Sequence, residues 1–265
     1  MTVKRMWALE GGTLTYTASD LVLTAGPDEV TIPVPTFLVE HERGLLLFDT
    51  GLAPESADAT EAVYGPMAAA ARITLTEEQR VDRQLAKIGF SPSDVTHVVV
   101  SHAHWDHVGG LHLFAQAQVF AGVGEVPHAY WPNSPAYSAA YRLADLDGAR
   151  GFAWHTLTGD HDVFGDGSVL LLLTPGHTPG HLSMLVRLPD GPLLLTGDAT
   201  HLRAGWERML PMGFDYSTDR AVASLQRLAR LADATGARVW INHDPDDWAA
   251  FGGAGQIGHM HAQAE

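Results

Sequence analysis

The sequence predicts an α/β protein whose sheets are covered by helices. Short apolar runs rich in β-forming residues alternate with amphipathic helical segments along the 265 residues, without a repeat, low-complexity tract or linker. No run approaches the roughly 18 consecutive apolar residues of a membrane helix. Hydrophobic residues make up 46% of the chain, which is ordinary for a globular protein. We therefore expect one domain over residues 1–265.

The first strands are expected in a hairpin. Residues 30–39 and 45–48 are apolar and β-rich, and the polar segment 40–44 between them has the composition of a turn. The motif Asp49-Thr-Gly51 then ends the second strand. A buried strand is expected over 95–100, because this short run is almost wholly apolar.

Two helices are predicted from their caps and their periodicity. The first covers 76–88, begins at Thr76 and has two glutamates in its first turn. The second covers about 218–234, with Thr218 or Asp219 as its N-cap. The remaining strands, all short apolar runs, are expected over 117–121, 168–173, 183–188, 193–196 and 239–241.

Composition excludes several classes of function. The formal charge of −15 argues against nucleic-acid and anionic-membrane partners, because phosphate binding needs basic patches. The chain has no cysteine, so disulfides, thiolate metal sites and cysteine nucleophiles are excluded. Any bound metal must be held by nitrogen and oxygen ligands. The N-terminal residues lack the long apolar core of a secretory signal, which predicts a cytoplasmic protein.

The strongest chemical signal is the segment Ser101-His-Ala-His-Trp-Asp-His-Val-Gly-Gly110, directly after a predicted buried strand. Its first two histidines are two residues apart, which places them on the same side of an extended segment. The aspartate and third histidine are expected in the turn that follows, and the two glycines should bend the backbone and open the next helix. Crowding these side chains without a metal would leave desolvated polar groups. The candidate ligands are His102, His104, Asp106 and His107.

Three further candidates, His177, Asp198 and His243, each follow directly on a predicted strand. Strand ends of this kind form the sites of many α/β proteins, at one edge of a sheet. A single catalytic metal usually has three protein ligands. Seven candidates therefore fit two metals that share one carboxylate. Imidazole and carboxylate ligands suit zinc, and also manganese, cobalt or iron.

The run His102-Ala-His-Trp-Asp-His107 resembles the His-x-His-x-Asp-His motif of the metallo-β-lactamase superfamily. The later three candidates occur in that family's order, and Asp49-Thr-Gly51 resembles its early strand-end motif. Within the superfamily, the chain is most similar to the N-acyl homoserine lactone lactonases. The segments that carry this similarity are Met1-Thr-Val-Lys-Arg5, Ile73-Thr-Leu-Thr-Glu-Glu-Gln79, Thr174-Pro-Gly-His-Thr-Pro-Gly-His-Leu-Ser183 and Asn242-His-Asp244.

The resemblance implies an αββα sandwich that holds two divalent cations, with zinc as the expected metal. It implies a first metal held by His102, His104 and His177. The second metal would be held by Asp106, His107 and His243, with Asp198 bridging the two.

The chain departs from the lactonases at two positions. His201 stands where they usually have a tyrosine that polarises the substrate carbonyl, and Asn242 stands where they usually have glycine. Histidine can also donate a hydrogen bond, so His201 either takes the same role or indicates a different substrate. The resemblance implies that Asp106 carries a proton to the leaving alkoxide. Asp49 is expected to orient a ligand histidine, and His181 is a weaker candidate for such a role.

The function implied is the opening of N-acyl homoserine lactones, which is quorum quenching. The alternatives are a lactonase similar to 4-pyridoxolactonase, another lactone, ester, thioester or phosphotriester hydrolase of the superfamily, or a non-enzymatic metal-binding protein. The expected partner is a small-molecule lactone, with no nucleic acid or membrane, and the chain could form a homodimer. Segment 127–145 is a candidate lid or dimer element. Candidate pocket aromatics are Trp7, Trp105, Tyr130, Trp131, Tyr137, Tyr141, Trp206 and Phe214.

Overall fold

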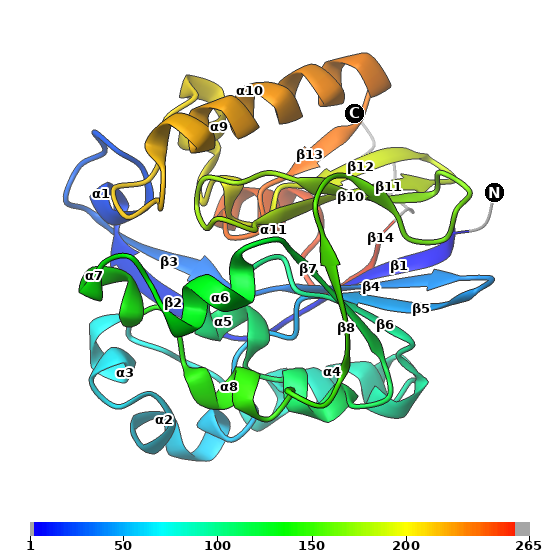
Figure 1. The fold of residues 1–265 in the computed structure, drawn as a ribbon, viewed down its shortest axis with the longest axis horizontal. Coiled ribbons are helices and arrows are strands. Elements are labelled where there is room, and N and C mark those ends of the chain that lie inside the picture. The colour runs from blue at the N-terminus through cyan, green and yellow to red at the C-terminus, as the bar shows by residue number, and fades with distance from the viewer. Residues whose placement is uncertain (1–2, 258–265) are drawn as a thin grey trace.

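The computed structural model describes residues 3–257, and in these residues two sheets pack face to face with helices on both outer sides (Figure 1). The predicted αββα sandwich is confirmed. Residues 1–2 and 258–265, which the expected single domain includes, lie outside the described residues. The strands of the larger sheet are, in spatial order, β14 (Gly255–Ile257), β1 (Val3–Leu9), β4 (Thr36–His41), β5 (Gly44–Phe48), β6 (His97–Val99), β7 (Gln118–Gly122) and β8 (Ala153–Leu157).

A smaller sheet faces this one, and a separate hairpin of β2 (Thr13–Thr17) and β3 (Glu29–Pro33) lies beside them. Strands β5 to β8 run parallel to one another, and so do the neighbouring strands β12 and β13, whereas the other pairs are antiparallel. The strands of the smaller sheet are β13 (Arg238–Trp240), β12 (Gly191–Leu195), β11 (Leu182–Leu188), β10 (Val169–Leu173) and β9 (His161–Asp162).

Helices cover the outer face of each sheet (Figure 1). Those over the smaller sheet include α9 (Arg203–Arg208) and α10 (Thr218–Thr235), and α11 (Pro245–Ala250) follows β13. The others come from the first half of the chain and its middle: α1 (Ala18–Leu21), α2 (Ser56–Tyr64), α3 (Pro66–Ala70), α4 (Val81–Lys87), α5 (Trp105–Val108), α6 (Glu125–Tyr130), α7 (Pro135–Ser138) and α8 (Leu143–Asp147). The 3-10 turns are η1 (Glu77–Gln79), η2 (Pro92–Asp94), η3 (Leu111–Phe114) and η4 (Gly197–Ala199).

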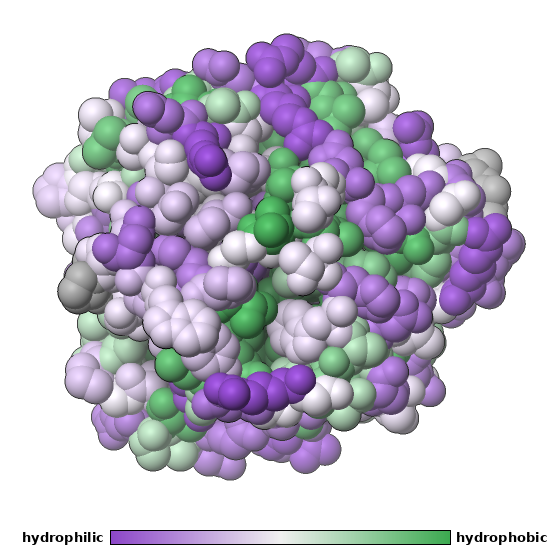
Figure 2. All heavy atoms as spheres, in the orientation of Figure 1, coloured by the Kyte–Doolittle hydropathy of each residue, from purple (hydrophilic) through white to green (hydrophobic). Residues whose placement is uncertain are grey.

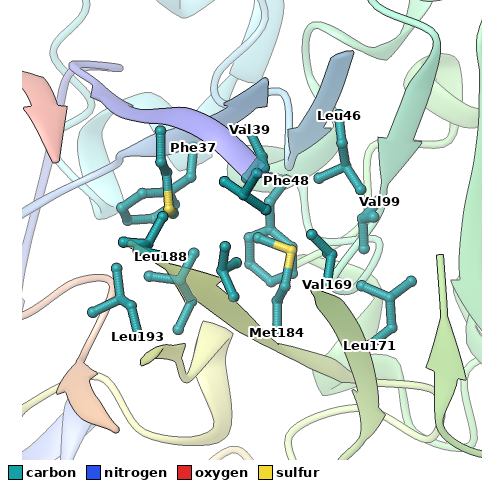
Figure 3. Packing of buried hydrophobic residues seen from close by; sticks show 14 of the residues in the cluster. Phe37, Val39, Leu46, Phe48, Val99, Val169, Leu171, Met184, Leu188 and Leu193 are labelled. Atoms are coloured by element: carbon teal, nitrogen blue, oxygen red, sulfur yellow. The ribbon is translucent and has the colours of Figure 1, made fainter. Parts of the chain in front are cut away.

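The main core lies between the two sheets (Figure 3). Phe48 and Val99 of the larger sheet pack there against Met184 and Leu193 of the smaller one. Neighbouring residues of β5 alternate between this core and a second cluster under α4, because successive side chains of a strand point to opposite faces. Both faces of the central strands are therefore buried, which explains their almost continuous apolar sequence.

Three predicted elements differ in detail from the structure. The strand expected over 30–39 is two strands, β3 and β4. Two prolines flank Val34, and proline has no N–H group to donate to the hydrogen bonds between strands. The helix expected over 76–88 is the turn η1 followed by α4, with an extended residue, Arg80, between them. The N-cap of α10 is Ser217, whose hydroxyl accepts the amide N–H of Arg220.

An apolar groove of about 530 Å³ lies between α6, β7 and β8 and includes part of segment 127–145. These elements are at the front of the view in Figure 1, and Figure 2 shows apolar atoms in the hollow near the centre of that face. Trp131 lines the groove and is 78% exposed. A homodimer through this face stays a prediction. No helix in residues 3–257 is long and apolar enough to cross a membrane.

Candidate metal centre

The candidate ligands meet at one edge of the sandwich, because they follow the carboxyl ends of strands in both sheets. The segment 102–107 follows β6, Asp198 follows β12 and His243 follows β13, while His177 comes from the loop between β10 and β11. The seven predicted ligands are all buried, and they form overlapping groups whose ligand atoms lie within 4.8 Å of one another. This is the arrangement expected from the strand-end positions.

The first group consists of three imidazoles. Nε2 of His102 lies 2.9 Å from Nδ1 of His104, and that nitrogen lies 3.0 Å from Nε2 of His177. Burial lowers the pKa of His102 and of His104 well below the ordinary value, and it lowers the pKa of His177 to about 3. All three rings are therefore neutral near pH 7, which is the form that ligates a metal.

The second group combines two imidazoles with a carboxylate. Nε2 of His107 lies 3.2 Å from Nε2 of His243 and 3.5 Å from Oδ2 of Asp106. Burial opposes a charge on His107, but the carboxylates of Asp198 and Asp106 outweigh it and raise its pKa well above the ordinary value. The pair of carboxylates thus favours positive charge at this position.

Asp198 lies between the two groups. Its Oδ2 is 3.6 Å from Nε2 of His102 and 3.6 Å from Nε2 of His177, and its Oδ1 is 3.2 Å from Nε2 of His243. Imidazole nitrogens that face one another about 3 Å apart around a shared carboxylate cannot all donate hydrogen bonds to one another. A pair of divalent cations would satisfy them, so the residues present fit such a pair.

Asp49 contacts a candidate ligand, His107, at the position from which the sequence analysis expected it to orient a histidine. Its Oδ2 accepts hydrogen bonds from Nδ1 of His107, 2.9 Å away, and from the Ser101 hydroxyl, 2.8 Å away. Its Oδ1 accepts the Ser101 amide N–H at 2.7 Å. Asp49 has a φ of 62°, which is uncommon for a residue other than glycine and indicates a strained backbone at the site.

His181 and Asn242 hold the loop that contains Asp198. Nε2 of His181 accepts the amide N–H of Asp198 at 2.9 Å, and the side-chain oxygen of Asn242 accepts the amide N–H of Gly197 at 3.2 Å. Burial lowers the pKa of His181 to about 3, so this nitrogen remains available as an acceptor. Both residues therefore act on the backbone next to Asp198.

Two supporting carboxylates were missed by the sequence analysis. Oδ1 of Asp215 lies 3.2 Å from Nδ1 of His177, and orients that ring. Glu125 is fully buried and accepts the amide N–H of Ala103 at 2.8 Å and the hydroxyl of Thr178 at 2.6 Å, so it joins the two ligand loops. Neither residue stands in a motif or at a ligand spacing, so the sequence carried no signal for them.

The two glycines after the histidine motif lie between two helical turns. They follow the one-turn helix α5, which contains Asp106 and His107, and Gly110 is the N-cap of η3, so the expectation that they open the next helical element is confirmed. Gly109 has a right-handed φ of −57°, but a Cβ atom there would lie only 2.2 Å from the amide nitrogen of Ala53. This glycine is required by close backbone packing, not by a sharp bend.

His201 lies beside the carboxylate of Asp198. Its Nε2 is 3.0 Å from Oδ2 of Asp198, its ring stacks on that of His243 with centroids 5.0 Å apart, and its buried Nδ1 has no partner among the described residues. His201 and Asp106 both line a small cavity of about 60 Å³ over the ligands. The other residues around this cavity are Leu14, Tyr16, Ile32, His104, Trp105, Ala140, Asp198 and Phe214.

Only some of the expected pocket aromatics are near this cavity. Trp105 and Phe214 line it, and the ring of Tyr141 packs on His104 with centroids 4.9 Å apart. Trp7 packs instead on Phe90 in the core under α4. Trp206 packs under α10, and Tyr130 and Trp131 line the outer groove. Tyr137 does not line the cavity, and its hydroxyl donates a hydrogen bond to the carbonyl of Asp215.

Comparison with known proteins agrees with this geometry. The family model of the metallo-beta-lactamase superfamily matches residues 31–236. The chain is 36% identical over 257 residues to the N-acyl homoserine lactonase AttM of Azorhizobium caulinodans, which covers 95% of this chain and 97% of that protein. It is 32% identical over 249 residues to the N-acyl homoserine lactonase of Bacillus cereus, covering 92% and 94%.

A solved structure of similar fold is that of a variant of B. thuringiensis AiiA with N-decanoyl-L-homoserine bound at the active site. It superposes with a TM-score of 0.83 at 25% identity and covers 94% of this chain and 97% of that one. The motif, the αββα sandwich and the family match agree over most of the described residues. The chain belongs to the metallo-beta-lactamase superfamily.

Proposed function

We propose that this protein is a metal-dependent lactonase that opens the ring of N-acyl homoserine lactones. The observation that carries the proposal is the pair of buried ligand groups that share Asp198. Relatives that carry the name N-acyl homoserine lactonase match nearly the whole chain, which supports the choice of substrate class. The proposal treats residues 1–265 as one domain, supported by a core that takes residues from both sheets.

The proposed cations are two zinc ions, held as His102, His104 and His177 on one side and Asp106, His107 and His243 on the other, with Asp198 between them. The neutral imidazoles and carboxylates support zinc, although manganese, cobalt and iron accept the same donors. When bound, such a pair lowers the pKa of water and polarises a carbonyl group. Asp49 and Asp215 hold the rings of His107 and His177 in the required orientation.

Asp106 and His201 are the side chains that we propose act on the substrate. Hydrolysis forms a bond from a water oxygen to the lactone carbonyl carbon, breaks the bond to the ring oxygen, and delivers a proton to that oxygen. Asp106 lines the cavity and is placed to carry this proton. His201 lines the same cavity and is placed to donate a hydrogen bond to the carbonyl oxygen.

A substrate panel on protein of known metal content tests the proposal. The panel contains N-acyl homoserine lactones of several chain lengths, 4-pyridoxolactone, a simple aryl ester, a thioester and a phosphotriester. We expect the acyl homoserine lactones to have the highest kcat/KM, with release of one acid equivalent per ring opened. A large preference for 4-pyridoxolactone or for a phosphotriester would replace the proposed substrate class, and inactivity toward the whole panel would contradict the proposal.

A further inference from the structure

We infer that Tyr16 is a substrate-binding residue whose phenol donates a hydrogen bond to a carbonyl oxygen of the bound lactone. The inference rests on the proposed function, because it names a further residue of the same cavity. Tyr16 stands in no motif of the sequence, and it is far in the chain from every ligand. Its assignment comes from the position of the β2–β3 hairpin.

The hairpin brings Tyr16 to the ligands through the alternation of side chains along a strand. Leu14 and Tyr16 are two residues apart in β2 and so point to the same side. Leu14 pairs with Ile32 of β3, and Tyr16 pairs with Val30. Leu14, Tyr16 and Ile32 all line the cavity, so the hairpin forms one of its walls.

The polar side chains that act on the substrate in the proposed reaction line the same cavity. Asp106, Asp198 and His201 share this space of about 60 Å³ with the hairpin residues. A substrate that reaches Asp106 and His201 therefore comes close to the hairpin wall. Leu14 and Ile32 offer only apolar atoms there, whereas Tyr16 brings a hydroxyl group to the same wall.

The hydroxyl of Tyr16 differs from most tyrosine hydroxyls of the protein. The hydroxyls of Tyr64, Tyr130, Tyr137 and Tyr141 are each hydrogen-bonded to another protein group. In the described part of the chain, that of Tyr16 has no hydrogen-bond partner. Tyr16 is half-buried and its hydroxyl is accessible, so a ligand in the cavity can supply the partner that the described residues do not.

A phenol suits this position chemically. It is protonated near neutral pH and is therefore a hydrogen-bond donor to a carbonyl oxygen. A donor aimed at an oxygen that gains negative charge stabilises the transition state, and removing one such donor costs about 10²–10³ in kcat. A donor to the amide carbonyl of the acyl group would contribute mainly to binding, and its removal would raise KM.

The test compares Tyr16→Phe, which removes only the hydroxyl oxygen, with Tyr130→Phe as a matched control. Tyr130 donates its hydroxyl to Asp147 on the surface and does not line the cavity. We expect Tyr16→Phe to lower kcat/KM by about tenfold or more. We also expect it to weaken binding of the ring-opened N-hexanoyl-homoserine, measured by calorimetry, by several-fold. Metal content should stay equal to wild type, and Tyr130→Phe should behave as wild type in each assay.

A second substrate shows which carbonyl receives the hydrogen bond. An alkyl γ-lactone lacks the amide group, so an equal loss on this compound and on N-hexanoyl homoserine lactone places the bond at the ring carbonyl. A loss confined to the acyl homoserine lactone places it at the amide carbonyl. Wild-type kinetics and product affinity in Tyr16→Phe would overturn the inference, as would loss of metal by this variant. Inactive wild-type protein would instead contradict the proposed function.

Discussion

Oδ2 of Asp49 lies 2.9 Å from Nδ1 of His107, while Nε2 of the same ring faces Asp198 at 3.3 Å. The carboxylate therefore fixes the orientation of the imidazole through Nδ1. Nε2 is the nitrogen of this ring that would ligate a metal. Asp49 reaches this position through an unusual backbone conformation, with a φ of 62°.

We predict that Asp49→Asn weakens binding at the second ligand group. Asparagine keeps the shape but lacks the charge that fixes the ring of His107, and loss of such a partner typically lowers metal affinity about 10–100-fold. Competition with a chelator, followed by metal analysis, measures the change. Asp147→Asn is the control, because Asp147 pairs with Arg150 on the surface. Equal retention of both metal equivalents by Asp49→Asn would show that the contact has no such role.

Substitution of the ligands themselves should remove metal and turnover together. His104→Ala deletes a nitrogen that faces both His102 and His177, and Asp198→Asn removes the charge of the carboxylate that lies between the two groups. We expect a lower metal content and a loss of lactone hydrolysis in each variant. Full activity in either one would count heavily against the proposed mechanism.

His201→Ala should separate catalysis from metal binding. If His201 donates to the substrate, the variant keeps its metal and loses kcat, by about 10²-fold where the donor acts on the developing negative charge. Inductively coupled plasma analysis and steady-state kinetics on one preparation measure both quantities. A parallel loss of metal would assign His201 to the ligands instead, a role that its place beside His177 and Asp198 also allows.

Gly109→Ala should destabilise the fold. The added methyl group would lie 2.2 Å from the amide nitrogen of Ala53, so the backbone must shift. Overpacking of this kind costs about 1–3 kcal/mol. Gly148→Ala is the matched control, because its Cβ would meet no atom closer than 3.5 Å. Urea unfolding of both variants gives the comparison, and equal midpoints would refute the packing argument.

Asp145 should make the stability depend on pH. Burial raises the pKa of Asp145 to about 7, although Arg142 pairs with it and opposes the shift. The pKa in the unfolded chain is about 3.9, so between these values the native state binds the additional proton. The free energy of unfolding therefore falls as pH rises from about 4 to about 7.

Asp145→Asn removes this titration. The free energy of unfolding should then fall less steeply with pH, by up to about 1.4 kcal/mol per pH unit. Urea unfolding at several pH values measures the slope, with the exposed Glu207→Gln as the control. An unchanged slope in Asp145→Asn would contradict the prediction.

Local sequence was sufficient for much of the fold. Both faces of β10 and β11 are covered, so their sequences are almost continuously apolar. Such a run can be recognised as a buried strand without knowing which strands pair with it. Turns were harder. The cap at Ser217 depends on a hydrogen bond that several neighbouring residue types could make.

The sequence by itself determined the seven candidate ligands, because imidazoles and carboxylates recur directly after predicted strands, and the family followed from the resemblance of the motif at 102–107. Only the tertiary structure decided what surrounds them. Asp215, Glu125 and Tyr16 reach the site from separate elements, each through a contact between residues more than 20 positions apart or through a shared cavity wall. Periodicity reports which face of an element is buried, whereas the partner of a side chain is selected by packing between distant segments.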